Sequence, residues 1–137
     1  MSTTTAQDRI DVVRRMYDAI NANDLDAIRG LLSDDCVRHY CIGSKTVLDG
    51  EIVGRDAIVA SYAFMIDHTN GDHHIDVGNV LANTALAASY HQETATRQRD
   101  GAHLDAKMFV RWRVEGGKVV ELWDYANDVP GLNAFLA

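Results

Sequence analysis

An alternation of apolar and polar residues over positions 104–114, interrupted only by Phe109, constrains the fold more than any other feature of the sequence. The odd-numbered positions include charged residues such as Asp105, Lys107 and Arg111, whereas every even-numbered position is apolar. A period of two predicts a β-strand with one buried and one solvent-exposed face. The predicted buried face consists of Leu104, Ala106, Met108, Val110, Trp112 and Val114.

Turn signals divide the second half of the chain, residues 72–128, into four segments of this kind. The signals are Ala82-Asn83, Asp100-Gly101 and Gly116-Gly117. Short breaks of this composition join consecutive antiparallel strands. The pattern therefore predicts a four-stranded antiparallel meander.

The first half of the chain has the longer period of amphipathic helices. A capping box of Thr4 and Gln7 begins the first predicted helix, Asp24 caps the second, and Asn70-Gly71 ends the third. A short extended segment, residues 36–40, lies between the second and the third. Three helices are therefore expected before the meander.

Helices that precede strands indicate an α+β domain, with three N-terminal helices packed on one face of a curved antiparallel sheet. The length of 137 residues is typical of one domain, and 47% of the residues are hydrophobic. We therefore expect residues 1–137 to form a single domain that can hold an internal pocket. The apolar stripes of the first and third helices direct Tyr17 and Tyr62 toward that pocket.

Charge and hydropathy argue against several classes of partner. The net charge is −7, and no segment gathers basic residues with aromatic ones, so nucleic acid is not an expected partner. The longest apolar run, residues 57–66, is shorter than the ~18 residues that span a bilayer, and the polar start lacks the apolar core of a signal peptide. The expected location is the cytoplasm.

The predicted hairpin at Asp100-Gly101 indicates which side chains of the preceding strand face inward. In a two-residue loop, residues whose numbers sum to 201 lie opposite one another, which pairs Glu93 with Met108 and His91 with Val110. Ser89, His91 and Glu93 therefore face the apolar interior. There Glu93 should have a raised pKa or pair with His91 or another donor. The spacing alone leaves open a functional pair or a structural hydrogen bond.

The last predicted strand contains Glu121 and Asp124. If Gly116-Gly117 is a two-residue turn, simple alternation directs Glu121 and Trp123 inward and Asp124 outward. Asp124 reaches the pocket only if a β-bulge shifts the alternation, and bulges are common on curved strands beside active sites.

Other histidines give weaker signals. His39 lies on the extended segment, where a packing role is the plain interpretation. His73 and His74 lie beside a turn, and His103 lies on the outer face of its strand. No metal site is therefore predicted, and the sequence lacks the motifs of phosphate loops, nucleophile elbows and zinc proteases.

The order of elements resembles the nuclear-transport-factor-two-like superfamily, specifically its SnoaL-like polyketide cyclase branch. The most specific similarity is the segment from Arg113 through Gly116-Gly117-Lys118 to Trp123-Asp124, and a second is Val37-Arg38-His39. The resemblance implies a cone-shaped domain with an internal pocket. It departs at Tyr40-Cys41, where many relatives have Asn-Pro, and at Val110, where an acid is common.

The resemblance implies an enzyme without metal or organic cofactor that cyclises or isomerises an apolar carbonyl compound. Asp124 then takes the place of the acid/base aspartate, His39 that of a pocket histidine, and His91 and Glu93 complete the catalytic group. The substrate pocket is expected to be lined by Tyr17, Tyr62, Ser89, Met108, Val110, Trp112 and Trp123.

Two other functions remain open. Limonene-epoxide-hydrolase-like proteins share the fold, and Glu93 and Asp124 could stand for their two acids, with His91 in the place of their arginine. The other open function is the non-catalytic binding of a hydrophobic small molecule, since one fold serves many functions. The resemblance also implies a homodimer, with the outer sheet face around Phe109 as a candidate contact.

Overall fold

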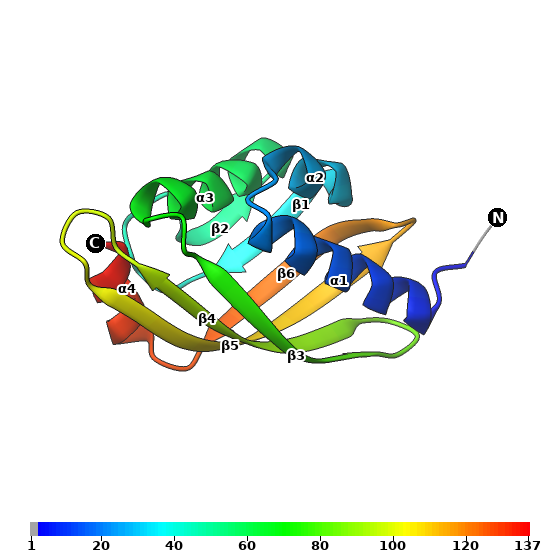
Figure 1. Ribbon diagram of the computed structural model, residues 1–137. Helices are drawn as coiled ribbons and strands as arrows, with labels where there is room; N and C mark the ends of the chain where they lie inside the picture. Colours follow the sequence, from blue (N-terminus) through cyan, green and yellow to red (C-terminus); the bar gives the residue numbers. More distant parts are fainter. Residues whose placement is uncertain (1–2) are drawn as a thin grey trace.

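Six strands form one curved sheet in the order β2-β1-β6-β5-β4-β3, and helices cover one of its faces (Figure 1). The computed structural model describes residues 3–137. The strands are β1 (Leu32–Tyr40), β2 (Gly50–Val53), β3 (His74–Ala82), β4 (Ala87–Thr96), β5 (His103–Glu115) and β6 (Lys118–Ala126). The helices are α1 (Ala6–Asn21), α2 (Leu25–Leu31), α3 (Arg55–His68) and α4 (Val129–Leu136).

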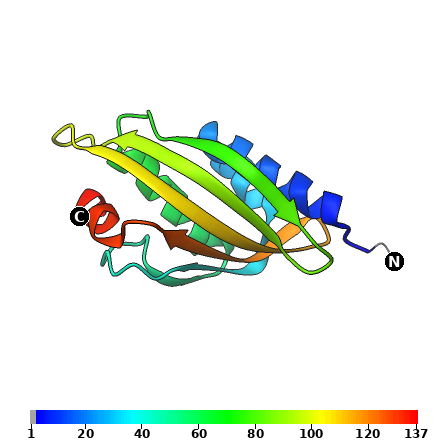
Figure 2. The same cartoon turned by 90° about the horizontal axis from the view of Figure 1, so that it is seen from below.

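The predicted meander is confirmed, and the sheet is larger than predicted. Strands β3 to β6 pair antiparallel in sequence order, and Figure 2 shows them side by side with the helices behind. The extended segment at residues 36–40 belongs to β1, which runs parallel to β6, and β2 pairs antiparallel with β1. The sheet is therefore mixed, where an antiparallel one was expected, and it curves around its helical cover as the α+β prediction states.

The three N-terminal helices are present, and a fourth closes the chain. Helix α1 begins with a capping box of Thr5 and Asp8, one position later than the expected pair of Thr4 and Gln7. Helix α2 follows the Asp24 cap as expected. Helix α4 was not predicted, because its eight residues are too few to display a helical period clearly.

The space between helices and sheet is the hydrophobic core. The even-numbered residues of β5 are buried, which confirms the alternation read from the sequence. They pack beneath residues of α1 and α3 such as Met16, Tyr17 and Ile58. Trp112 is the largest of the fully buried side chains. The floor of the pocket is thus the concave face of β4, β5 and β6.

The register between β4 and β5 differs from the predicted one by two residues. His91 lies opposite Met108 and Ser89 opposite Val110, so the paired numbers sum to 199 and not to 201. The reason is a longer loop, because Arg97 N–H donates to Ala102 O and leaves four residues in the turn. A shift of two keeps every side chain on its face, so the predicted inward direction of Ser89, His91 and Glu93 is correct.

A β-bulge in β6 turns Asp124 inward. Val114 pairs with Val119, but Arg113 pairs with Glu121, so Val120 is an extra residue on β6. Beyond it the alternation is reversed, and Asp124 lies opposite the buried Val110. The simple alternation that directed Glu121 and Trp123 inward is therefore wrong.

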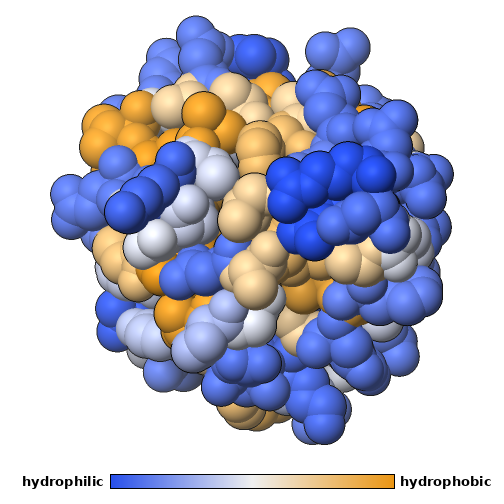
Figure 3. All heavy atoms as spheres, turned by 90° about the vertical axis from the view of Figure 1, so that its left-hand side faces the viewer, coloured by the Kyte–Doolittle hydropathy of each residue, from blue (hydrophilic) through white to orange (hydrophobic). Residues whose placement is uncertain are grey.

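Helix α4 packs across one end of the sheet. Asn133 donates to Ile42 O, and the last turn is held by Arg97 and His68, which bind the carbonyls of Ala134 and Phe135. Figure 3 views this end and shows apolar residues set between projecting hydrophilic ones. Within residues 3–137, no helix is long and apolar enough to cross a membrane.

Candidate active site

A narrow hollow with a free volume of about 20 Å³ lies between the helices and the concave face of the sheet. Its walls come from α1, α3, β1 and the meander, and most of its lining is apolar or aromatic. The free core is narrow, with room for about one water molecule. The polar side chains that reach it are Tyr17, Arg38, Tyr40, Tyr62, His73, His91, Glu93 and Asp124.

Arg38 and Asp124 form a buried ion pair on one side of the hollow. Arg38 Nε donates to Asp124 Oδ2 at 2.9 Å, and the two side chains are only 8% and 5% exposed. The strand pairing between β1 and β6 brings the two residues together. Asp124 Oδ1 has no hydrogen-bond partner among residues 3–137. Arg38 therefore fixes the carboxylate through one oxygen and leaves the other available.

Two tyrosine rings and a serine fix the Arg38 guanidinium. It lies 4.7 Å from the ring centre of Tyr40 and 4.4 Å from that of Tyr62, within cation–π range, and it donates to Ser61 Oγ at 3.0 Å. Burial lowers the pKa of Arg38, but the charge of Asp124 outweighs it and raises that pKa above its usual range. Arg38 is therefore a permanent buried cation.

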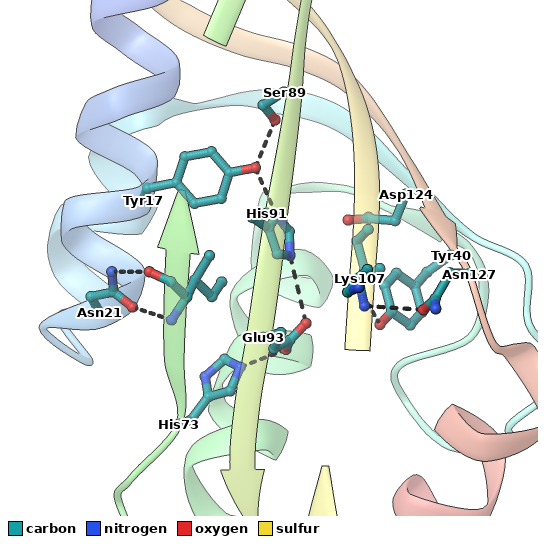
Figure 4. A network of polar contacts seen from close by, with 12 residues as sticks. Tyr17, Asn21, Tyr40, His73, Ser89, His91, Glu93, Lys107, Asp124 and Asn127 are labelled. Atoms are coloured by element: carbon teal, nitrogen blue, oxygen red, sulfur yellow. Dashed lines mark hydrogen bonds and ion pairs between the residues drawn. The ribbon is translucent and has the colours of Figure 1, made fainter. Parts of the chain in front are cut away.

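Glu93 lies between two histidines on the other side (Figure 4). Its Oε1 is 2.5 Å from His73 Nε2, and its Oε2 is 3.7 Å from His91 Nε2. Burial raises the pKa of Glu93, but the hydrogen bond with His73 and the nearby ring of His91 outweigh it and hold the pKa well below its usual value. The sequence analysis expected either a raised pKa or a hydrogen-bond partner for Glu93. The structure shows the partner, and Glu93 is ionised.

A chain of hydrogen bonds leads from the sheet to His91. Trp112 Nε1 donates to Ser89 Oγ at 2.9 Å, and Ser89 Oγ lies 2.6 Å from the Tyr17 hydroxyl. That hydroxyl lies 2.8 Å from His91 Nδ1. His91 Nε2 is buried and has no hydrogen-bond partner within residues 3–137. One ring nitrogen of His91 is thus fixed, and the other is unused.

The tyrosines of the hollow remain protonated. Burial raises the pKa of Tyr17, Tyr40 and Tyr62 well above the usual value, and nearby acids raise it further. Within residues 3–137, the only hydrogen-bond partner of the Tyr40 hydroxyl is Met108 Sδ at 3.8 Å, a weak acceptor. Tyr40 is therefore a hydrogen-bond donor that a ligand could use.

His39 and Trp123 lie on the outer face of the sheet, which corrects their expected place in the pocket. His39 Nε2 is 2.7 Å from Glu121 Oε2, and the His39 ring stacks on Trp123 with 5.3 Å between centres. Arg111 covers the indole of Trp123 at 4.0 Å. The physical reason is strand alternation: Arg38 and Tyr40 occupy the inner face of β1, so His39 between them points outward.

The other predicted site residues lie on the inner side. Asp124, His91 and Glu93 reach the hollow, and Figure 4 shows Asp124 of β6 across from the two β4 side chains. Ser89 is buried behind Tyr17 and Trp112 and does not line the hollow. The remaining predicted lining residues, which do line it, are Tyr17, Tyr62, Met108, Val110 and Trp112.

The sequence analysis missed three polar residues of the pocket, Arg38, Tyr40 and His73. His73 precedes β3, and the signal for it is the buried Ile75 two positions later, because residues two apart share a face. No such signal marks Arg38, because an arginine is expected at the surface as long as its buried acidic partner is unknown. Although His73, Glu93 and His91 lie close together, no group of three or more histidine, cysteine or acidic side chains within residues 3–137 is arranged so that it could hold a metal ion.

Several solved structures share this architecture. Bal32a, from a soil-derived mobile gene cassette, is 24% identical, with a TM-score of 0.89 over 96% of this chain and 98% of that one. IdmH, a putative polyketide cyclase from Streptomyces antibioticus, is 22% identical, with a TM-score of 0.76 over 92% and 96%. An epoxide hydrolase of the limonene-epoxide-hydrolase-like type from M. tuberculosis is 17% identical, with a TM-score of 0.75 over 96% and 90%.

These identities establish the shared fold and no more. A search of curated proteins found no match. The model of the SnoaL-like domain matches residues 13–122, which include the second half of α1, most of the sheet and the pocket acid Glu93, but not Asp124. On this match, the chain belongs to the SnoaL-like domain family.

Proposed function

We propose that this protein is an acid/base enzyme that moves a proton on a carbon next to the carbonyl of an apolar compound, in a cyclisation or isomerisation that needs no metal or organic cofactor. One observation carries the proposal: Asp124 presents a free carboxylate oxygen to an apolar hollow, while Arg38 holds the other oxygen.

Asp124 is the proton carrier in this proposal. A carboxylate removes a proton efficiently when it is held at a fixed distance from the reacting carbon and shielded from water. Its side chain is 5% exposed, and Arg38 fixes its orientation from the side away from the free oxygen. Glu93 is less suited to this role, because its lowered pKa makes it a weak base.

His91 and Tyr40 are the candidate donors for the oxygen that becomes negative. Removal of the proton converts a carbonyl into an enolate, and preorganised donors stabilise that charge. Among the residues that the structure describes, His91 Nε2 has no hydrogen-bond partner, and the Tyr40 hydroxyl donates only to a thioether. Both belong to residues that line the same hollow as Asp124.

Membership in the SnoaL-like family and the similarity to IdmH, itself described as a putative polyketide cyclase, support this class of reaction. The apolar lining supports an apolar substrate. Because the free core is narrow, a substrate larger than water must displace side chains at entry.

Deuterium exchange tests the proposal without the natural substrate. Flat apolar ketones such as 2-tetralone are incubated with the protein in D₂O, and loss of the proton beside the carbonyl is followed by NMR. The wild type should accelerate exchange, and Asp124→Asn should reduce the enzyme-dependent rate by about 10²–10⁴-fold. Glu115→Gln, an exposed acid, is the matched control. Equal exchange rates in Asp124→Asn and wild type would refute the proposal.

Epoxide hydrolysis is the second candidate, and the water-sized core beside two acids favours it. Asp124 would activate a water molecule and His91 would donate to the epoxide oxygen. Incubation with cyclohexene oxide in H₂¹⁸O distinguishes epoxide hydrolysis from the proton-transfer reaction. A diol that carries ¹⁸O, and that forms only with the wild type, supports hydrolysis. Saturable ligand binding with neither exchange nor diol supports a binding protein.

A further inference from the structure

We propose that Trp112, Ser89 and Tyr17 act together as positioning residues that hold His91 as the tautomer with its proton on Nε2, so that the ring donates a hydrogen bond into the hollow. The catalytic meaning of this arrangement rests on the function proposed above, but the arrangement itself does not.

The direction of the chain follows from its first member. An indole N–H can donate and cannot accept, so Trp112 Nε1 donates to Ser89 Oγ. The hydrogen of the Ser89 hydroxyl then needs an acceptor. Ser89 is 3% exposed, and its only other polar contact within residues 3–137 is the Tyr17 hydroxyl, at 2.6 Å. Ser89 therefore donates to Tyr17.

The next two bonds follow in the same direction. The Tyr17 oxygen accepts from Ser89, so its own hydrogen is free to donate, and His91 Nδ1 lies 2.8 Å away. The raised pKa of Tyr17 keeps that hydrogen in place near neutral pH. His91 Nδ1 is consequently an acceptor and unprotonated, and a neutral ring with that nitrogen free has its proton on Nε2.

The reverse direction leaves a buried donor without a partner. If His91 Nδ1 donated to Tyr17, one hydroxyl hydrogen would have no acceptor: that of Ser89 if Tyr17 donated to Ser89, or that of Tyr17 if Ser89 donated to Tyr17. An unsatisfied buried donor costs more than a formed hydrogen bond gains. The proposed direction satisfies every donor from Trp112 to Tyr17 and leaves only the His91 Nε2 hydrogen without a partner within residues 3–137, where it faces the hollow and the Glu93 carboxylate 3.7 Å away.

Packing and charge support the same ring orientation. The Tyr17 ring contacts His91 edge-on at 5.3 Å and Trp112 edge-on at 5.8 Å between centres, so the three rings restrict one another. The Nε2 hydrogen is on the side of Glu93, whose nearest oxygen is 3.7 Å away, beyond hydrogen-bond range. Glu93 is already bound to His73, so the Nε2 donor stays available for a ligand oxygen.

Histidine ring NMR on the full chain tests this inference. The protein is labelled with ¹⁵N-histidine, His91 is assigned by the signal that disappears in His91→Gln, and long-range ¹H–¹⁵N spectra are recorded at pH 7.5. The inference expects an unprotonated Nδ1 and a protonated Nε2 for His91. A protonated Nδ1, alone or together with a protonated Nε2, would overturn it.

Variants test whether this series of hydrogen bonds determines the tautomer of His91. Tyr17→Phe keeps the ring packing and removes the donor, so the Nδ1 signal should shift toward that of a free or mixed tautomer. Ser89→Ala should give a smaller shift in the same direction, and it is the second test if Tyr17→Phe does not fold. Tyr90→Phe, on the same strand but packed on the outer face against Phe109, should change nothing.

An unchanged His91 signal in both Tyr17→Phe and Ser89→Ala would overturn the positioning role. So would an equal shift in Tyr90→Phe. None of these measurements needs turnover, so an absence of deuterium exchange would count against the proposed reaction and leave the tautomer assignment intact.

Discussion

Two carboxylates of the same hollow, Asp124 and Glu93, are held in different ways. Glu93 lies between His73 at 2.5 Å and His91 at 3.7 Å, with both of its oxygens facing a histidine. Asp124 is bound by Arg38 through one oxygen alone. The difference teaches that burial and charge do not by themselves identify a reactive acid. Each acid has one hydrogen-bonded oxygen, but the second oxygen of Glu93 lies 3.7 Å from His91, whereas no ion pair or hydrogen bond within residues 3–137 holds the second oxygen of Asp124.

The largest effect should come from removing the cation that Asp124 needs. Arg38→Met leaves a buried carboxylate without its partner, and we expect the free energy of unfolding in urea to fall by about 3–5 kcal/mol. Arg38→Met combined with Asp124→Asn should recover part of this loss, because no unpaired charge remains. Arg113→Met, an exposed arginine in surface ion pairs, should change stability by less than about 1 kcal/mol. A similar loss in both single variants would contradict the assignment.

The two acids should differ in their effect on exchange. Asp124→Asn is expected to lower the enzyme-dependent deuterium exchange rate by about 10²–10⁴-fold, whereas Glu93→Gln should lower it by about tenfold, since Glu93 acts only through the histidines beside it. The rates are compared at the same fraction of folded protein. If Glu93→Gln were the more damaging change, the roles assigned to the two acids would be reversed.

Acid should weaken the protein through Glu93. Its pKa in the folded state lies below the ordinary 4.5, so its contribution to stability is full above that value and is lost as the pH falls below it. The difference in unfolding free energy between wild type and Glu93→Gln should therefore be constant from pH 7 to 5 and shrink from pH 4 to 3. A difference that grows in acid would show that Glu93 is not stabilised as an anion.

A substitution on the outer face of the sheet should have the smallest effect on the hollow. Phe109 is 61% exposed and lies between Tyr125 and Tyr90, and we propose this apolar face as the contact of a homodimer. Sedimentation should give twice the chain mass of 15.1 kDa for the wild type and the single mass for Phe109→Glu, with an unchanged exchange rate. A wild type that stays at 15.1 kDa would rule out a stable dimer under those conditions.

The inward direction of His91 and Glu93 was predictable because it depends only on the parity of a strand. The predicted register was wrong by two residues, yet the faces were right, since a shift of two preserves parity. The same argument failed for Glu121 and Trp123, because the extra residue Val120 shifts the alternation by one. The place of Asp124 was anticipated only through a family resemblance and the condition that a bulge exists.

Sequence alone determined the class of the fold, the strands of the meander and the apolar face of β5, because those depend on local periodicity and on where apolar side chains can avoid water. Tertiary structure decided the site. The pairing of Arg38 with Asp124, the approach of His73 to Glu93 and the outward turn of His39 join residues that are distant in the chain. Buried charges are stable only in pairs, and no local sequence pattern indicates which residue of the folded protein is the partner.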